Sequence, residues 1–271
     1  MAEGPGPGAV TFSLVIPAFN EAERLPANLA AVRAYLDARP WTYEVVVVDD
    51  GSGDGTGLLL EEMAAGWPQL RPVLGQHRGK GGAVRAGLLA ARGTLVALAD
   101  ADFSMPVAEL DRLIAATEEE CDVAIGSREA PGAVRYGEPW YRHVMGRIFN
   151  ALVRVLLLPD LQDTQCGFKC LRGPVAAELV RAQTLDGWGF DVELLYAARR
   201  RGYTIREIGI PWYYVRGSRV QPARDTVTMV RDVLRVWANA RRGLYARPST
   251  SPVAAGPAET SLAAAPTTRE R

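Results

Sequence analysis

Short apolar runs alternate with amphipathic segments along residues 13–126 of this 271-residue chain. The runs are rich in Val, Ile and Leu and end at Gly or Asp, and the segments between them have helical spacing. Continuous apolar strands separated by helices are typical of a parallel sheet that is covered on both faces. The pattern therefore predicts an α/β fold with a mostly parallel, doubly wound sheet. Its expected strands are FSLVIPA, YEVVVVDD, LRPVLG, TLVALADAD and CDVAIGS, and its expected helices are 21–38, 54–65, 79–92 and 106–118.

Polar residues follow three of these strands at the point where each strand ends. The first strand leads into Pro17-Ala18-Phe19-Asn20-Glu21, the second into Asp49-Asp50-Gly51-Ser52, and the fourth into Asp100-Ala101-Asp102. In a doubly wound sheet, ligands bind at the carboxyl ends of the strands, where the strand order reverses. A helix cap could explain one of these clusters, but caps explain three of them poorly. We therefore expect a ligand site at this edge of the sheet.

Two of the motifs at this edge have a chemistry suited to a metal-bound diphosphate. Asp100 and Asp102 offer hard oxygen ligands, and Mg²⁺ typically takes one or two protein carboxylates and completes its shell with water and phosphate oxygens. The GKGGAVR stretch places Lys80 and backbone N–H groups at the start of a helix, where phosphate is favoured. Taken alone, the aspartates could cap the next helix and the glycine-rich stretch could be a flexible loop with solvated charges. Together they predict a metal–diphosphate site.

Two amphipathic helices are predicted in the second half of the chain, at 140–158 and 223–242. In the first, an apolar stripe lies opposite a polar one that contains His143, Arg147, Asn150 and Arg154. In the second, two apolar rows have cationic edges that include Arg231 and Arg235. Packing against the core explains either helix alone. Contact with a membrane surface gains support when the two helices are considered together.

Composition excludes several classes of protein. Lys and Arg number 31, as do Asp and Glu, so no global positive field favours nucleic acid, and we expect no nucleic-acid partner. Three cysteines are too few for a disulfide framework, which favours a reducing cytoplasm. No segment approaches the roughly 18 consecutive apolar residues of a membrane span, so a soluble or peripheral protein is expected. Residues 1–11 and 244–271 have the composition of a disordered lead and a disordered tail.

Six motifs occur in a characteristic order: VIPAFNE, VVVVDDGSGDGT, HRGKGGAVRAG, LADAD, IGSR and DTQCGFK. In this order they resemble the family-2 glycosyltransferases of the GT-A fold, and among these the dolichyl- and polyprenyl-phosphate β-glucosyltransferases. The resemblance runs from about Phe12 to Arg235, and GKGGAVR with DTQCGFK favours the glucosyl branch over the polyprenyl-phosphate mannose synthases. It implies one domain over 12–243, with a nucleotide-sugar half at 12–128 and an acceptor half at 129–243.

The resemblance implies an inverting transfer of glucose from UDP-glucose to a polyprenyl phosphate at the cytoplasmic face of the membrane, with Mg²⁺ or Mn²⁺. On the donor side it implies that Asp50, with Asp49 behind it, selects uridine, and that Asp102 is the direct metal ligand beside Asp100. The other implied donor residues are Pro17, Ala18, Asn20, Glu21, Lys80 and Ala101. Relatives with an N-terminal membrane helix reach the lipid through it, whereas here the two amphipathic helices would have to supply membrane access, unless the acceptor is soluble.

On the acceptor side, the resemblance implies that Arg128 and Arg142 hold the lipid phosphate and, with Asp100 and Asp102, form the catalytic set. Ser218 and Arg219 resemble a late Ser-Lys pair of the family, although the loop here is shorter and Arg replaces Lys. A phosphate monoester is already anionic near neutral pH, so a general base is dispensable.

Two further carboxylates, Asp191 and Glu193, could face the sugar, although Glu193 could instead pair with Arg199 or Arg200 on an exposed helix. Three functions stay open at this point. They are the glucosyltransferase, a transferase of the same fold that uses GDP-mannose or a soluble acceptor, and a nucleotide-sugar-binding protein without turnover.

Overall fold

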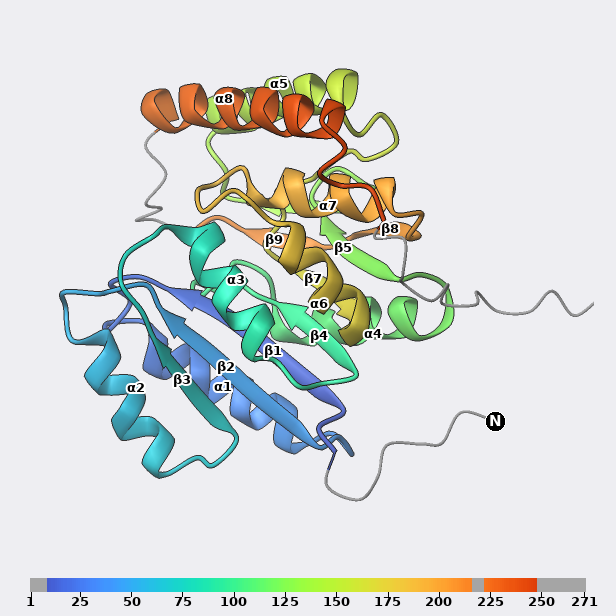
Figure 1. Cartoon of the computed structure of the whole chain (residues 1–271). Helices are drawn as coiled ribbons and strands as arrows, with labels where there is room; N and C mark the ends of the chain where they lie inside the picture. The colour runs from blue at the N-terminus through green and yellow to red at the C-terminus, as the bar shows by residue number, and fades with distance from the viewer. Residues whose placement is uncertain (1–8, 216–221, 248–271) are drawn as a thin grey trace, which may run out of the picture.

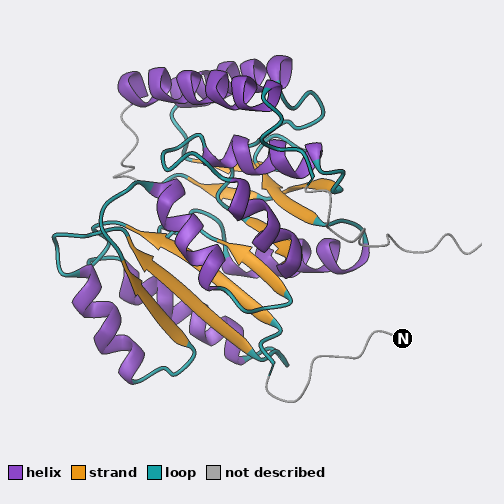
Figure 2. Cartoon of the chain, viewed as in Figure 1, coloured by secondary structure: helices purple, strands orange, loops and turns teal. Residues whose placement is uncertain are grey.

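The computed structural model describes residues 9–215 and 222–247, and its centre is a seven-stranded sheet with the order β3-β2-β1-β4-β7-β5-β8 (Figures 1 and 2). The strands are β1 (Phe12–Ala18), β2 (Tyr43–Asp49), β3 (Leu70–Leu74), β4 (Leu95–Leu98), β5 (Val123–Ser127), β7 (Lys169–Arg172) and β8 (Ile205–Gly209). Neighbouring strands pair in parallel except at β7, which is antiparallel to both β4 and β5. The mostly parallel, doubly wound sheet predicted from the sequence is confirmed.

Helices cover both faces of this sheet (Figure 1). They are α1 (Leu25–Asp37), α2 (Thr56–Ala65), α3 (Lys80–Ala90), α4 (Leu110–Glu119), which follows the short 3-10 helix η1 (Val107–Glu109), α6 (Gly173–Ala182) and α7 (Phe190–Arg200). Strand β1 is apolar along its whole length because both of its faces are buried. Leu14 and Ile16 pack in the core with α1 and α4, whereas Val15 packs in the core with α3, α6 and α7. A strand buried on both faces needs no polar alternation.

The predicted helix 21–38 begins four residues later than expected, at Leu25. Asn20 has a left-handed backbone with φ of 53°, and its N–H donates to Ser52 Oγ at 2.7 Å. The N–H of Glu21 donates to Thr56 Oγ1 at 2.9 Å. These bonds tie the loop after β1 to the loop after β2 and to the start of α2, so residues 20 and 21 do not join the helix.

A separate layer above the sheet consists of α5 (Trp140–Leu156) and α8 (Pro222–Arg241), which lie side by side (Figure 1). Phe149 and Val153 of α5 and Val233 and Val236 of α8 point into the core, so both predicted amphipathic helices are confirmed as helices that dock through one face. No helix in residues 9–215 or 222–247 is long and apolar enough to cross a membrane.

Tyr245 lies within the range predicted as a disordered tail, but it is buried in the core and donates to Glu193 Oε1 at 2.7 Å. The ordered chain therefore extends past residue 243, because this tyrosine packs in the core and bonds to Glu193 of α7. The rest of the predicted tail, 248–271, and residues 1–8 of the predicted lead lie outside the described residues. All three cysteines are buried and unpaired, as expected from their number.

The second half also contains strands that the sequence pattern did not predict. Strand β7 enters the sheet between β4 and β5, and β6 (Val134–Tyr136) pairs in parallel with β9 (Pro211–Tyr213) in a small second sheet. Strand β7 begins with Lys169, a charged residue that is fully buried in the structure. Because of this lysine, the segment lacks the apolar run that marks a central strand.

Candidate active site

A pocket of about 580 Å³ opens at the carboxyl ends of β1 and β4. The chain runs from β1 outward to β2 and β3, then crosses back to β4 on the other side of β1, so the strand order reverses at this point. Met145 and Phe149 of α5 and Met229 of α8 line the pocket from the layer above. The pocket therefore lies between the sheet edge that the sequence indicated and the two amphipathic helices.

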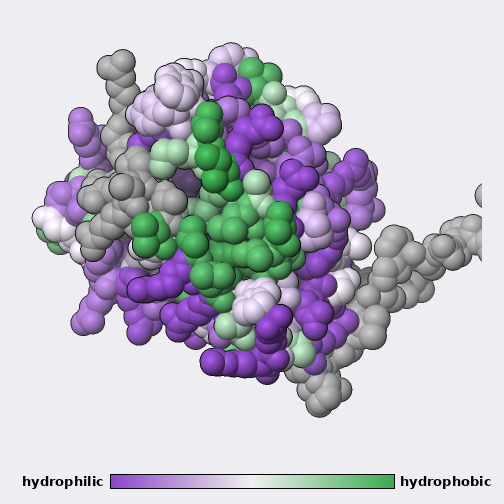
Figure 3. Space-filling model, turned by 90° about the horizontal axis from the view of Figure 1, so that it is seen from above, coloured by the Kyte–Doolittle hydropathy of each residue, from purple (hydrophilic) through white to green (hydrophobic). Residues whose placement is uncertain are grey.

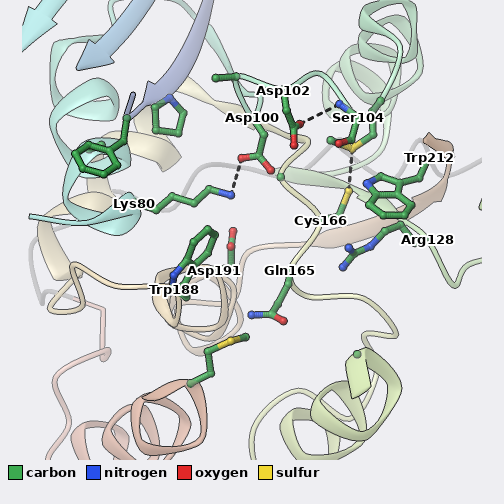
Figure 4. A pocket seen from close by; sticks show the side chains of 18 of the residues that line it. Lys80, Asp100, Asp102, Ser104, Arg128, Gln165, Cys166, Trp188, Asp191 and Trp212 are labelled. Carbon is green, nitrogen blue, oxygen red and sulfur yellow. Dashed lines mark hydrogen bonds and ion pairs between the residues drawn. The ribbon is translucent and has the colours of Figure 1, made fainter. Parts of the chain in front are cut away.

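Asp100 and Asp102 both line the pocket, but their surroundings differ (Figure 4). Asp100 Oδ1 lies 2.5 Å from Lys80 Nζ, and although burial opposes the charge, this ammonium holds the pKa of Asp100 below its ordinary value. Burial, together with the nearby Asp100 charge, raises the pKa of Asp102. Asp102 Oδ1 accepts the Ser104 N–H at 3.0 Å, and Asp102 forms no ion pair with any described residue. A divalent cation fits at Asp102, because its carboxylate lacks a cationic partner.

Two glycines make this arrangement possible. A Cβ on Gly167 would collide with the Asp100 carboxylate, so a side chain there would displace Asp100. Gly79 has φ of 112°, and a Cβ there would lie 2.7 Å from the Asp186 carbonyl oxygen. Only glycine lets the chain turn this closely into α3, which brings Lys80 to the pocket.

The predicted donor residues line the pocket with two exceptions. Pro17, Ala18, Glu21, Asp50, Lys80, Asp100, Ala101 and Asp102 all contribute to its wall. Asp49 and Asn20 lie behind it and hold loops, since Asp49 Oδ1 accepts the Ser52 N–H at 3.1 Å and Asn20 Oδ1 accepts the Gly53 N–H at 2.8 Å. The sequence alone does not distinguish Asp49 and Asn20 from the lining residues, because they are adjacent to them in the chain.

Asp50 is buried and holds the loop that precedes α3. Its two carboxylate oxygens accept the N–H groups of Arg78 and Gly79, each at 2.8 Å. His77, whose Nδ1 lies 2.8 Å from Asp50 Oδ2, stacks on Phe19 with ring centroids 4.3 Å apart. Phe19 and His77 line the pocket too and give this end an aromatic wall.

Arg128 and Arg142, the two arginines that the resemblance placed on the acceptor side, both line this pocket. Arg128, just after β5, makes three bonds to Asp163, from its backbone N–H at 3.0 Å, from Nε at 2.7 Å and from Nη2 at 2.9 Å. Asp163 is fully buried, and although burial opposes its charge, Arg128 lowers the pKa of Asp163 to about 2. The partner of Arg128 thus comes from the DTQCGFK segment, and not from Glu129 or Asp122, which are nearer to Arg128 in the sequence.

Arg142 is held differently from Arg128. Its guanidinium carbon lies 5.4 Å from the centre of the Tyr214 ring, and its buried Nε has no hydrogen-bond partner. No described carboxylate pairs with it. Ser218 and Arg219, the other predicted acceptor residues, lie outside the described residues.

The family model of glycosyl transferase family 2 matches residues 13–179, which include the sheet edge, Arg128 and Asp163. The chain belongs to this family. The dolichyl-phosphate β-glucosyltransferase of Drosophila melanogaster is 34% identical over 244 residues, covering 84% of this chain and 75% of that protein. The protein of the same name from Homo sapiens is 32% identical over 237 residues, covering 82% of this chain and 73% of that protein. This chain is thus a glycosyltransferase.

Solved structures show the same GT-A fold. Glucosyl-3-phosphoglycerate synthase from Mycobacterium tuberculosis, in complex with Mn²⁺ and UDP-glucose, aligns with a TM-score of 0.59 at 22% identity, covering 89% of this chain and 81% of that one. Mannosyl-3-phosphoglycerate synthase from Rubrobacter xylanophilus aligns with a TM-score of 0.61 at 18% identity, covering 86% of this chain and 74% of that one.

In this family-2 glycosyltransferase the two remaining carboxylates, Asp191 and Glu193, lie in different surroundings. Asp191 lines the pocket and pairs with the buried Lys169, and burial raises the pKa of Asp191. Glu193 is fully buried away from the pocket and accepts the N–H groups of Thr184 and Leu185. The expectation of an exposed pair between Glu193 and Arg199 or Arg200 is wrong, because α8 and the residues after it cover this side of α7.

Several residues at the pocket were not predicted from the sequence. Trp188 reaches toward the pocket from the loop before α7, with its ring 5.3 Å from Lys80 Nζ (Figure 4). Trp212 of β9 lies 5.6 Å from the Arg128 guanidinium, and Arg135 of β6 is paired with Glu129 and Glu138. The aromatic residues of WGF and PWYY are the signal that could have pointed to these segments.

Proposed function

We propose that this enzyme transfers glucose from UDP-glucose to a polyprenyl phosphate, with inversion, at the cytoplasmic face of a membrane. The observation that carries the proposal is a single pocket lined by Asp102 and Lys80 at the sheet edge, by Arg128 just after β5 and by Arg142 in the first turn of α5. The names of the relatives, dolichyl-phosphate β-glucosyltransferases, support the same sugar and the same class of acceptor.

At the donor end, Asp102 would hold Mg²⁺ or Mn²⁺, with Asp100 beside it, and the cation supplies charge neutralisation for the leaving diphosphate. The Mn²⁺ and UDP-glucose in the M. tuberculosis structure support this choice. Lys80 and the N-terminal N–H groups of α3 would add positive charge near the phosphates. Asp50 would face the base from the aromatic end formed by Phe19 and His77.

At the acceptor end, Arg128 and Arg142 would bind the lipid phosphate. Asp163 occupies Nε and Nη2 of Arg128, so Nη1 is left to donate into the pocket, and Arg142 has no competing carboxylate among the described residues. A phosphate oxygen would attack the anomeric carbon while the bond to the nucleoside diphosphate breaks on the opposite face. Because this oxygen is anionic near neutral pH, positioning by guanidinium groups matters more than a general base.

The outer faces of α5 and α8 support peripheral membrane contact. Val144, Ile148 and Val155 of α5 and Val227 and Leu234 of α8 are exposed, and Figure 3 shows an apolar area on this side with hydrophilic margins. An exposed apolar patch rimmed by polar residues is typical of an interaction surface. The lipid phosphate could then reach the pocket beneath the two helices, where Met145 and Met229 line the wall.

A transfer assay with labelled nucleotide sugars tests the proposal. UDP-glucose, UDP-galactose and GDP-mannose would each be incubated with Mg²⁺ and either a short polyprenyl phosphate in detergent or 3-phosphoglycerate. We expect label in the lipid product with UDP-glucose alone, and tighter calorimetric binding of UDP than of GDP. Transfer from GDP-mannose, or transfer to 3-phosphoglycerate in place of the lipid, would refute the assignment.

A further inference from the structure

A second, smaller pocket of about 140 Å³ lies beside α5, outside the catalytic pocket. It is lined by Glu129, Arg147, Asn150, Ala151, Arg154 and Gln162, and we call it the α5 side pocket. Asn150 lines both pockets, so its side chain stands in the wall between them. The proposed transfer reaction makes no use of Arg147, Arg154 or Gln162.

The α5 side pocket has an excess of positive charge. Arg147 and Arg154 lie two turns apart on α5, and neither forms an ion pair or a hydrogen bond with any described residue. Glu129, the acid in the wall, is already paired with Arg135 at 2.6 Å. The two guanidinium groups therefore remain available for an anion, and guanidinium geometry suits a phosphate ester.

The pocket also contains an unpartnered polar group. Asn150 is 7% exposed, and its Oδ1 has no hydrogen-bond partner in the described part of the chain. Leaving a buried acceptor unsatisfied is costly, and such groups usually have a partner. A ligand that offers a hydroxyl donor next to a phosphate would satisfy both Asn150 and the arginines.

The position of the pocket on α5 indicates what kind of phosphate it meets. At roughly 100° per residue, Arg147 and Arg154 lie about 90° around the helix from the middle of the exposed stripe of Val144, Ile148 and Val155. If that stripe rests on a bilayer, side chains at a right angle to it lie at the level of the lipid headgroups.

We propose that the α5 side pocket binds the phosphodiester of an anionic phospholipid that has a hydroxyl-bearing headgroup, such as phosphatidylglycerol. Arg147 and Arg154 hold the phosphate oxygens, and a headgroup hydroxyl donates to Asn150 Oδ1. The inference rests on the membrane contact of the proposed function, but not on its sugar or its acceptor. A bound headgroup fixes the rotation of α5 on the bilayer, and through Asn150 it adjoins the pocket that receives the lipid acceptor.

Co-sedimentation of the full chain with vesicles tests this site without nucleotide sugar or polyprenyl phosphate. Vesicles of phosphatidylcholine with phosphatidylglycerol would be compared with phosphatidylcholine alone. For Arg147→Gln with Arg154→Gln we expect roughly a 25-fold weaker partition into the anionic vesicles, from about fivefold per surface cation. The control pair, Arg181→Gln with Arg200→Gln, makes the same charge change on α6 and α7 and should change partition less than twofold.

A charge-preserving pair separates a built site from diffuse attraction. Arg147→Lys with Arg154→Lys keeps both charges but loses the planar donor pairs, so we expect at least a threefold weaker partition. Gln162→Glu, which adds a carboxylate to the wall, should weaken partition by a similar factor. The site would be overturned if the lysine pair partitioned into the vesicles as the wild type does. It would also be overturned if the glutamine pair and its control pair lost partition equally.

A third arm distinguishes a lipid headgroup from a free anion. Calorimetric titration of the wild type with inorganic phosphate should show no binding that depends on Arg147 and Arg154. If phosphate binds and the glutamine pair abolishes that binding while vesicle partition matches the control pair, the lipid assignment is wrong. The detergent transfer assay of the wild type reports on the proposed function separately, so the two can fail independently.

Discussion

Arg142 and Arg128 share a pocket but should respond differently to truncation. Arg142→Ala should lower use of the polyprenyl phosphate by about 10- to 160-fold while leaving the free energy of unfolding nearly unchanged. A hydrogen bond to a charged group contributes roughly 1.5–3 kcal/mol, which corresponds to a factor of this size. Arg142 has no carboxylate partner in the described chain, and its contact with the Tyr214 ring at 5.4 Å is the interaction that the fold loses.

Arg128→Ala should damage stability as well as acceptor binding. It leaves Asp163 fully buried and charged without its two guanidinium bonds. Removing one partner of a buried ion pair typically costs about 3–5 kcal/mol of the free energy of unfolding. A loss of activity in this variant alone would therefore not identify an acceptor site. Arg128→Lys, which keeps a charge near Asp163, separates the two effects in part.

The assay combines three measurements on each variant. Steady-state kinetics with varied polyprenyl phosphate reports acceptor use, calorimetric titration with UDP and Mg²⁺ reports donor binding, and denaturant unfolding reports stability. Arg181→Ala, on the exposed side of α6, serves as the charge-matched control. We expect unchanged UDP affinity for Arg142→Ala, because the donor residues occupy the opposite wall.

Two outcomes would contradict this reasoning. If Arg142→Ala retains normal acceptor kinetics, or loses UDP binding in parallel, this arginine does not bind the acceptor phosphate. If Arg128→Ala unfolds at the same denaturant concentration as the wild type, the bonds to Asp163 do not stabilise the fold as described.

Two further predictions concern the carboxylates. Asp102→Asn should abolish most Mg²⁺-dependent transfer while circular dichroism stays that of the wild type, and undiminished transfer in excess EDTA would exclude the metal. Asp163 has its pKa lowered from 3.8 to about 2, so its charge stabilises the fold above about pH 4, and this contribution is lost as the pH falls toward 2. The wild-type free energy of unfolding should therefore fall by about 2 kcal/mol more than that of Asp163→Asn between pH 4 and pH 2, and parallel curves would refute the low pKa.

The sheet and its ligand edge could be predicted from local sequence because each strand is a continuous apolar run that ends in polar residues. Strand β7 could not be predicted in this way. The charge of its Lys169 is neutralised by Asp191, which is distant in the sequence and comes near only in the folded chain. The same reason hides the partner of Arg128, because Asp163 is 35 residues away and nearer carboxylates compete in the sequence. Local pattern indicates which residues are polar, but which of them pair depends on the tertiary fold.

The DTQCGFK segment shows why the two ends of the pocket depend on each other. Asp163 at its start grips Arg128, Gly167 leaves room for the Asp100 carboxylate, and Lys169 at its end pairs with Asp191. One short segment thus contacts Arg128 on the proposed acceptor side, Asp100 on the proposed metal side, and Asp191, which also lines the pocket. The segment leads into β7, which pairs antiparallel with β4 and β5, and this pairing fixes the separation of these groups because both neighbours carry site residues at their ends. On this assignment, the distance between the leaving diphosphate and the acceptor phosphate is set by the sheet and not by a mobile loop.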